Sequence, residues 1–293
     1  MTSQRAMMLA ALAFFIWVLS DTAMKIGCMN AGVVPVPAIM AIVGIIGSLI
    51  ISTGSLALGR NHALLPSAGY SMHLTMAICF SGNVVANAIA FKHLPLTSFY
   101  IVVFTTPLTI AVLSAAMKYE KLTRHKIACL LAGFLGMLLA IGGASGGGDL
   151  TGYIAAAMGT ICFSTNALLM RKSAKEASVE SIQLFNYLCM GLIGCVWIVI
   201  SNAQMPSLSV LGVIAASGTL LAIGSLCFNT ALQNTVATNV AQLHYTQIIY
   251  GSITGYLIWN EVPTWSLLFG SGIIICAGLL VARQAKIEDK LTA

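Results

Sequence analysis

The sequence places one carboxylate, Asp21, inside an apolar run, where a charged side chain is costly and usually faces a partner or water. Trp17 precedes it and Lys25 follows it by one helical turn, so the three side chains share a helical face. Two interpretations of Asp21 remain open. It forms a local ion pair near the membrane surface with an outward-reaching Lys25, or it lines a cavity and holds a substrate amine or a transported proton. Trp17 beside a carboxylate suits an organic cation, and it equally suits packing or interfacial anchoring.

A polar stripe follows one face of the apolar run at 68–91. His73, Phe80, Asn83 and Asn87 are separated by seven, three and four residues, which is helical periodicity. Two amides one turn apart offer donors and acceptors that suit a zwitterion, so Asn83 and Asn87 are candidate substrate contacts. The alternative is that these amides hydrogen-bond to neighbouring helices.

His244 and Tyr245 are the most polar point of the run at 238–259. Residues 181–260 contain no Lys, Arg, Asp or Glu, which singles out His244 there. A neutral imidazole can bond a carboxylate or carry a proton, but a neighbouring helix satisfies such a histidine equally often. Both residues are candidate substrate contacts. Weaker candidates are Tyr100, Phe104, Phe163, Asn166 and Asn229.

Patterns for catalysis or metal binding are weak in this sequence. The stretch 143–147 satisfies G-x-S-x-G, but it joins two apolar runs, whereas a nucleophile elbow lies between a strand and a helix. The eight cysteines are dispersed without a CxxC pair, which argues against a zinc site and a disulfide scaffold and favours small core residues. We therefore expect no catalytic residue, no metal, no cofactor and no enzymatic activity.

The composition explains why so few polar residues stand out. Hydrophobic residues make up 58% and charged residues 8% of the chain, against about 45–50% and about 25% in soluble domains. A globule of this size cannot bury that much apolar surface, so the expected surroundings are a lipid bilayer. The basic residues form no continuous face, which argues against a nucleic-acid partner.

Ten apolar runs approach the about 20 residues that a membrane-spanning helix needs. Segments rich in Gly, Pro, Asn and Ser separate them. Arg5 precedes the first run and no small-residue cleavage site follows it, which predicts a retained membrane helix rather than a signal peptide. The runs lie at approximately 6–26, 36–58, 68–91, 96–117, 125–143, 152–171, 180–201, 208–231, 238–259 and 265–283.

The basic residues also indicate how the chain crosses the membrane. If the N-terminus is cytoplasmic, twelve of the fourteen Lys and Arg residues fall in inside loops, and Lys25 and Lys92 fall outside. This bias is the positive-inside pattern. The sequence therefore predicts a multi-pass protein of a bacterial-type cytoplasmic (inner) membrane with both termini in the cytoplasm.

The chain divides into two similar halves around the linker GGASGGGDLTG. An offset of 141 residues superposes Glu120 on Glu261, and an offset of 146 superposes WVLSDTAMK on FSTNALLMR. Five spans per half is an odd number, so the second half enters the membrane from the opposite side. Pro107 is opposite Ile248, which predicts that the fourth and ninth spans do not bend alike. The predicted units are 1–143 and 152–283 as five-helix repeats, 144–151 as linker and 284–293 as a cytoplasmic tail.

These features resemble the drug/metabolite transporter superfamily, in particular EamA-type transporters with ten helices. The resemblance rests on the Trp-containing first span, the Pro-bearing fourth span closing on YEKLT, and the ninth span closing on WNEVPT. The tract 237–264 also looks like the equivalent tract of bacterial S-adenosylmethionine carriers. The resemblance implies an all-α integral membrane protein with ten transmembrane helices in two inverted five-helix repeats.

The same resemblance implies secondary transport of a small organic metabolite by alternating access, with a proton or ion as a candidate coupling partner. Amino acids or their derivatives are the favoured cargo, because amides, a histidine, a carboxylate and aromatic rings suit a zwitterion with a side chain. The alternatives are a non-transporting membrane receptor or assembly partner, and an intramembrane enzyme.

Overall fold

The computed structural model describes residues 1–31, 35–65, 69–93, 99, 102–119, 123–141, 149–260 and 265–292. Side chains are described in these ranges except at 24–31, 88, 91, 92, 140, 141, 252, 259, 267 and 281–292. All regular secondary structure in the described ranges is helical. Tyr100, Glu120, Glu261 and the serine of the G-x-S-x-G stretch lie outside these ranges, and Lys25 lies outside the described side chains.

The α-helices follow the predicted apolar runs. They are α1 (Ser3–Ala31), α2 (Val36–Ala57), α3 (Tyr70–His93), α5 (Thr106–Ala116), α6 (Arg124–Ile141), α7 (Leu150–Lys172), α8 (Val179–Ser201), α9 (Leu208–Asn234), α10 (Ala237–Gln242), α11 (Thr246–Trp259) and α12 (Trp265–Thr292). Short 3-10 helices are η1 (Asn61–Leu64), η2 (Ser173–Lys175) and η3 (Leu243–Tyr245). The fourth run corresponds to α5, and the ninth run to α10, η3 and α11 together.

Several helices are apolar enough to cross a membrane. Within the described residues, five qualify by length and composition, and they lie at Ser3–Ala23, Val36–Ala57, Leu150–Lys175, Val179–Ser201 and Leu208–Asn234. Two shorter apolar helical stretches are Thr106–Ala116 and Leu268–Leu280. The chain is therefore an all-α, multi-pass membrane protein.

Local sequence determines where the helices of the second half begin and end. Asp149 caps α7 by accepting a hydrogen bond from the backbone nitrogen of Gly152 at 2.9 Å. Ser178 caps α8 in the same way, accepting from Ser181 at 3.1 Å. Asn202 ends α8 with a left-handed backbone, φ 48°, which asparagine tolerates better than most residues.

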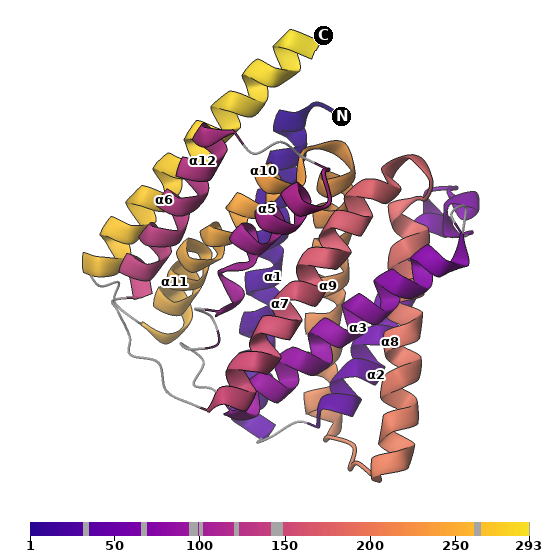
Figure 1. Ribbon diagram of the computed structural model, residues 1–293. Helices are drawn as coiled ribbons and strands as arrows, with labels where there is room; N and C mark the ends of the chain where they lie inside the picture. The colour runs from indigo at the N-terminus through magenta and orange to yellow at the C-terminus, as the bar shows by residue number, and fades with distance from the viewer. Residues whose placement is uncertain are drawn as a thin grey trace.

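The two halves run in opposite directions through the bundle. Both termini lie at one end, called here the terminus end; α1 starts there, whereas α7 starts at the opposite, far end (Figure 1). Helices of different halves pack against each other as α1 with α9, α3 with α7, α2 with α8 and α6 with α12. Exchanging the halves maps the first two pairs onto each other and the last two onto themselves. This is the arrangement of inverted repeats.

Small residues allow close contact where α2 crosses α8. A Cβ added to Gly44 would lie 2.4 Å from the Cα of Gly191, so the two backbones touch. One turn along, a Cβ on Gly194 would lie 2.4 Å from the backbone nitrogen of Ala41. Membrane helices without a hydrophobic driving force between them commonly pack in this way.

The fourth and ninth spans are both interrupted, the fourth by a turn and the ninth by a 3-10 helix. In the fourth span Phe104 and Thr105 form a turn before α5 begins. In the ninth span η3 separates α10 from α11. Under the 141-residue offset Thr105 corresponds to Thr246, the residue at which α11 begins. A proline in only one half therefore does not prevent both halves from breaking at the same place.

A packed apolar cluster closes the terminus end of the bundle. Many of its members come from the first turns of α1 and α8 and the last turns of α7 and α9, among them Ala6, Ala10, Met170, Ile182 and Leu232. Each of these five side chains is fully buried, with an exposed fraction of 0%. Packed apolar side chains therefore fill the bundle on the side where the termini lie.

Candidate functional site

A cavity of about 290 Å³ lies among α1, α3, α7 and α9 and the two interrupted spans. Five aromatic residues line it: Trp17, Phe80, Phe99, Phe163 and Phe228. Ten polar residues line it as well: Asp21, Asn83, Asn87, Thr106, Thr160, Asn166, Ser225, Asn229, His244 and Gln247. The remaining lining residues are Val84, Val103, Ala167 and Leu221.

The cavity lies on the axis that relates the two repeats. Most lining residues fall into pairs that occupy the same position in each half, with the offset of 146 residues for the α1/α7 pair and 141 for the others. The pairs are Trp17 and Phe163, Asp21 and Ala167, Phe80 and Leu221, Val84 and Ser225, Asn87 and Phe228, Val103 and His244, and Thr106 and Gln247. Equivalent positions converge on one space, as expected of a site between inverted repeats.

The charge in the cavity comes from one half. Asp21 is solvent-accessible there, and its repeat partner is the uncharged Ala167. Among the described lining residues no Lys or Arg faces it, and none of the ion pairs between described residues involves it. The cavity interpretation of Asp21 thus has geometric support, whereas Lys25, on which the ion-pair interpretation depends, lies outside the described side chains.

The asparagine side chains of the cavity differ in how many hydrogen bonds they form with the protein. Asn83 donates from Nδ2 to the backbone oxygen of Gly159 at 2.9 Å, and Asn166 donates to that of Met76 at 2.8 Å. In the described part of the chain, Asn87 Oδ1 has no hydrogen-bond partner. Each of these amides therefore keeps unused hydrogen-bonding capacity beside the cavity, because an amide has two donors and an acceptor.

His244 stands in η3 within an aromatic enclosure. Its ring stacks on Phe14 with centroids 5.1 Å apart and an interplanar angle of 22°, and it meets the rings of Phe104 and Phe163 at 5.8 and 5.9 Å. Gln247 bonds the imidazole from one helical turn away. Nδ1 is buried and finds no partner among the described residues, so one ring nitrogen stays available for a ligand or a water molecule.

Trp17 is seated in a notch of α9. A Cβ added to Gly224 would lie 2.6 Å from Cδ1 and 2.7 Å from Nε1 of the indole, so only glycine leaves room for it. The ring tilts against Phe228 with centroids 4.9 Å apart. Its Nε1 is buried and has no partner within the described chain. The indole therefore forms part of the wall through its face and carries an unused donor.

The structure brings together seven of the nine predicted site residues. Trp17, Asp21, Asn83, Asn87, Asn166, Asn229 and His244 all line the cavity. Tyr100 lies outside the described residues.

Tyr245 is not among the residues that line this cavity. Its ring is 1% exposed and packs in a cluster with Phe104, Met137 and Ile274. A Cβ on Gly133 of α6 would lie 2.6 Å from it. In the 3-10 turn adjacent residues point in different directions, so Tyr245 faces α6 when His244 faces the cavity. His73 also lies elsewhere, bonded to Ser181 at 3.3 Å.

Some lining residues did not emerge from the sequence: Thr106, Thr160, Ser225 and Phe228. Ser, Thr and Phe are common in membrane helices and carry no signal alone. The repeat offset could have found one of them, because Phe228 occupies the position of the candidate Asn87 in the other half.

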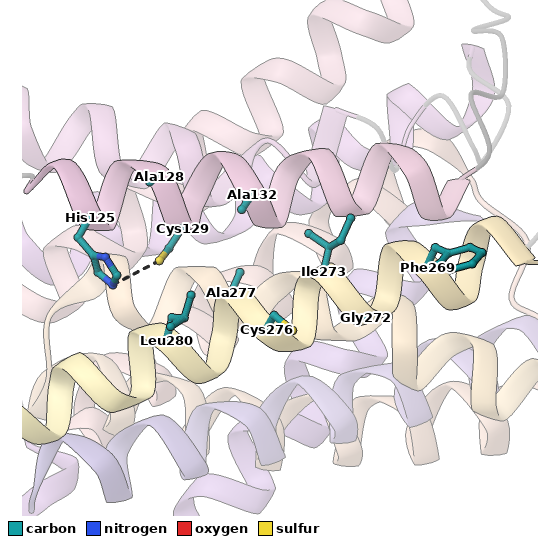
Figure 2. A pocket seen from close by; sticks show the side chains of 10 residues that line it. All are labelled: His125, Ala128, Cys129, Ala132, Phe269, Gly272, Ile273, Cys276, Ala277 and Leu280. Atoms are coloured by element: carbon teal, nitrogen blue, oxygen red, sulfur yellow. Dashed lines mark hydrogen bonds between the residues drawn. The ribbon is translucent and has the colours of Figure 1, made fainter.

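A second, larger cavity of about 510 Å³ lies between α6 and α12 (Figure 2). Its walls are apolar, with Phe269 and Leu280 being 67% and 48% exposed, so it opens at the periphery of the bundle. At one end His125 Nε2 lies 3.7 Å from Cys129 Sγ. Among its described lining residues, no cluster of polar groups could recognise a polar metabolite.

Comparisons with known proteins agree with this architecture. Residues 4–142 and 150–283 each match the EamA-like transporter family. The pseudopaline exporter CntI from each of two strains of Pseudomonas aeruginosa is 23% identical over 281 residues, covering 95% of this chain and 96% of the exporter. A solved crystal structure shares the fold with a TM-score of 0.84 at 18% identity, covering 97% of this chain and 99% of the other.

The family match covers nearly the whole chain, once in each half. Because the family consists of transporters, the match confirms that the protein is not an enzyme. It also accounts for a central cavity shared by both repeats. The chain belongs to the EamA-like transporter family of the drug/metabolite transporter superfamily.

Proposed function

We propose that this protein is a secondary transporter of small organic metabolites that carry an ammonium group, amino acids or their derivatives foremost. The observation that carries the proposal is the central cavity, in which Asp21 is the charged side chain among the described lining residues. Among the described lining residues no basic side chain faces this carboxylate, which favours a cationic group and disfavours a free anion. Aromatic walls suit the same group through cation–π attraction.

The remaining polar groups support a ligand with a second polar end. His244 and Gln247 lie in the second repeat, and Asp21 lies in the first. They could bind a carboxylate or carbonyl of the ligand while Asp21 holds its amine. The volume of about 290 Å³ is near the lower end of ligand pockets, which run from about 300 to about 1,000 Å³. A small metabolite is therefore the best fit.

The closed terminus end supports alternating access. An apolar cluster packs between the cavity and the termini, and Asp21 lies in the second half of α1, toward the far end. With both termini in the cytoplasm, as the basic loops predict, this apolar cluster lies on the cytoplasmic side of the cavity. Exchange of conformation between the inverted repeats would then open the cytoplasmic side. The curated relatives are exporters of a metabolite, which supports outward transport.

Topology, unit boundaries and coupling belong to the same proposal. We infer a bacterial-type inner membrane location with cytoplasmic termini, and repeats at 1–143 and 152–283 joined by 144–151 and followed by a tail at 284–293. A proton or another cation is the proposed coupling partner, because Asp21 can bind either and this chain shows no nucleotide-binding motif.

Uptake into proteoliposomes tests the proposal. Purified protein is reconstituted and supplied with a metabolite pool containing amino acids, their amine derivatives and pseudopaline, under an imposed proton or sodium gradient. The expected result is accumulation of a compound with a cationic nitrogen, lost in Asp21→Asn and kept in part by Asp21→Glu. Binding without movement under any gradient would favour a receptor, and preference for anions without a cationic nitrogen would overturn the substrate class.

A further inference from the structure

A threonine stands at the same point of both interrupted spans. Thr105 donates from Oγ1 to the backbone oxygen of Val102 at 2.6 Å, and Thr246 donates to that of Leu243 at 2.6 Å. The 141-residue offset relates both the donors and the acceptors. Each threonine also directs its backbone N–H to the same carbonyl, which thus receives two hydrogen bonds from one residue.

This pair of hydrogen bonds to one carbonyl is present at the interruption in both halves. An α-helix directs each carbonyl to the N–H four residues later, whereas here the carbonyl is engaged three residues later. Hydroxyl groups that bond back to the helix bend it, and a 3-10 turn inside a helix often marks a functional point. Pro107 is present in only one half, since Ile248 takes its place in the other. The feature common to both breaks is the threonine.

Each threonine is flanked by side chains that line the cavity. Val103 and Thr106 lie two residues before and one residue after Thr105, and both line the cavity. His244 and Gln247 have the same positions relative to Thr246 and also line it. A continuous helix would rotate residues three apart by about 300°, so the turn decides where these side chains point.

We propose that Thr105 and Thr246 are paired positioning residues of the transport site. They hold the turns that direct the flanking side chains into the cavity, while they themselves are absent from its lining. Thr246 sets the positions of His244 and Gln247, and Thr105 does the same for the repeat-related side chains. The effect on transport rests on the proposed function, whereas the effect on the turns does not.

Hydrogen–deuterium exchange of the purified full chain in lipid nanodiscs tests the turn directly. Thr246→Val removes the hydroxyl while keeping the shape of the side chain, and it should raise amide exchange at residues 243–247 by roughly three- to tenfold. Thr246→Ser should restore the wild-type rate. Thr254→Val is the matched control: its hydroxyl bonds Gly251 three residues back at 3.0 Å, within the same helix but away from the break.

Transport provides the second readout, using the compound that the proteoliposome screen identifies. Thr246→Val should raise KM several-fold with a smaller change in maximal rate, and Thr105→Val should act in the same direction. Equal exchange at 243–247 in Thr246→Val and wild type, or an equal rise in Thr254→Val, would overturn the proposal. If wild-type protein moves no compound, the proposed function fails, and the exchange measurement still decides whether the threonines hold the turns.

Discussion

Asn166 on α7 donates a hydrogen bond from Nδ2 to the backbone oxygen of Met76 on α3, 2.8 Å away, and so joins the second repeat to the first. The repeat offsets assign these places in the other half to Ser20 on α1 and Ser217 on α9. Those two hydroxyl oxygens are 2.9 Å apart, and each hydroxyl also lies within bonding distance of the other residue's backbone oxygen. Both inter-repeat helix pairs are therefore fixed at the same level, by different side chains.

Replacing Asn166 by Ala should weaken the contact between α3 and α7. The backbone oxygen of Met76 loses a donor and a small cavity forms, which costs about 0.5–2 kcal/mol in membrane helices. Unfolding in detergent micelles measures the loss, and Ser20→Ala should produce a similar one. Asn234→Ala is the control, because Asn234 bonds within its own helix, to Thr230 at 2.8 Å, and is exposed. An equal effect at Asn234 would contradict the inter-repeat role.

Gly224→Ala should displace the indole of Trp17 from the cavity wall. The added methyl group would lie 2.6 Å from the indole, and overpacking of this kind typically costs about 1–3 kcal/mol. Trp17→Phe should relieve the clash, so the double variant should be more stable than the additive expectation. Unfolding of the single and double variants measures the coupling. Gly212→Ala is the control: an added Cβ there meets nothing within 4 Å, so this variant should not be destabilised. Purely additive effects of Gly224→Ala and Trp17→Phe would contradict the close contact between Gly224 and the indole.

The fold was predictable because its signals are long and repeated. Ten apolar runs with basic residues in alternate loops determine the number of crossings, and an odd number per half then requires opposite orientations. Asp21 was predictable as a candidate site residue for a related reason. A carboxylate in an apolar span is rare enough to be conspicuous without any knowledge of the neighbouring helices.

The rest of the site depends on which helix faces meet, and the sequence does not carry that information residue by residue. Ser225 and Thr160 resemble many other small polar residues of the spans and line the cavity only because of where α9 and α7 pack. Tyr245 was named only as the neighbour of His244, but adjacent residues of a helical turn point in different directions, and its ring packs with Phe104 and Met137 instead. Pro107 gave no indication of the interruption in the ninth span, where the Thr246 hydroxyl bonds back to the helix.

Gly44→Ala should be among the most damaging small substitutions in the protein. The methyl group would lie 2.4 Å from the Cα of Gly191, so α2 and α8 would have to separate along their contact. A loss of about 3 kcal/mol or more is expected, because backbone atoms cannot rotate away as side chains do. Gly54→Ala in the same helix meets nothing within 4 Å and is the matched control. Equal unfolding temperatures for the two variants would show that the helices can separate without cost.

Asp149 should make stability depend on pH at the far end of the bundle. The backbone N–H of Gly152, and next the side chain of His93 at 2.8 Å, hold the pKa of this carboxyl below its usual range. A folded-state pKa below the unfolded value stabilises the protein above the unfolded pKa, which is about 3.9. That contribution is lost as the pH falls through the folded-state pKa.

Asp149→Asn and Asp149→Ala separate the charge of Asp149 from its capping role. Asparagine caps a helix about as well as aspartate, so Asp149→Asn should keep the stability of α7 at neutral pH and flatten the decrease below about pH 4. Alanine supplies no cap and should lower the unfolding temperature at every pH. His93→Gln removes the second cause and leaves the bond from Gly152, so part of the decrease should persist. The unfolding temperatures of wild type and the three variants are measured from about pH 3 to about pH 8. If Asp149→Asn loses stability at low pH as steeply as wild type, the loss comes from other carboxylates.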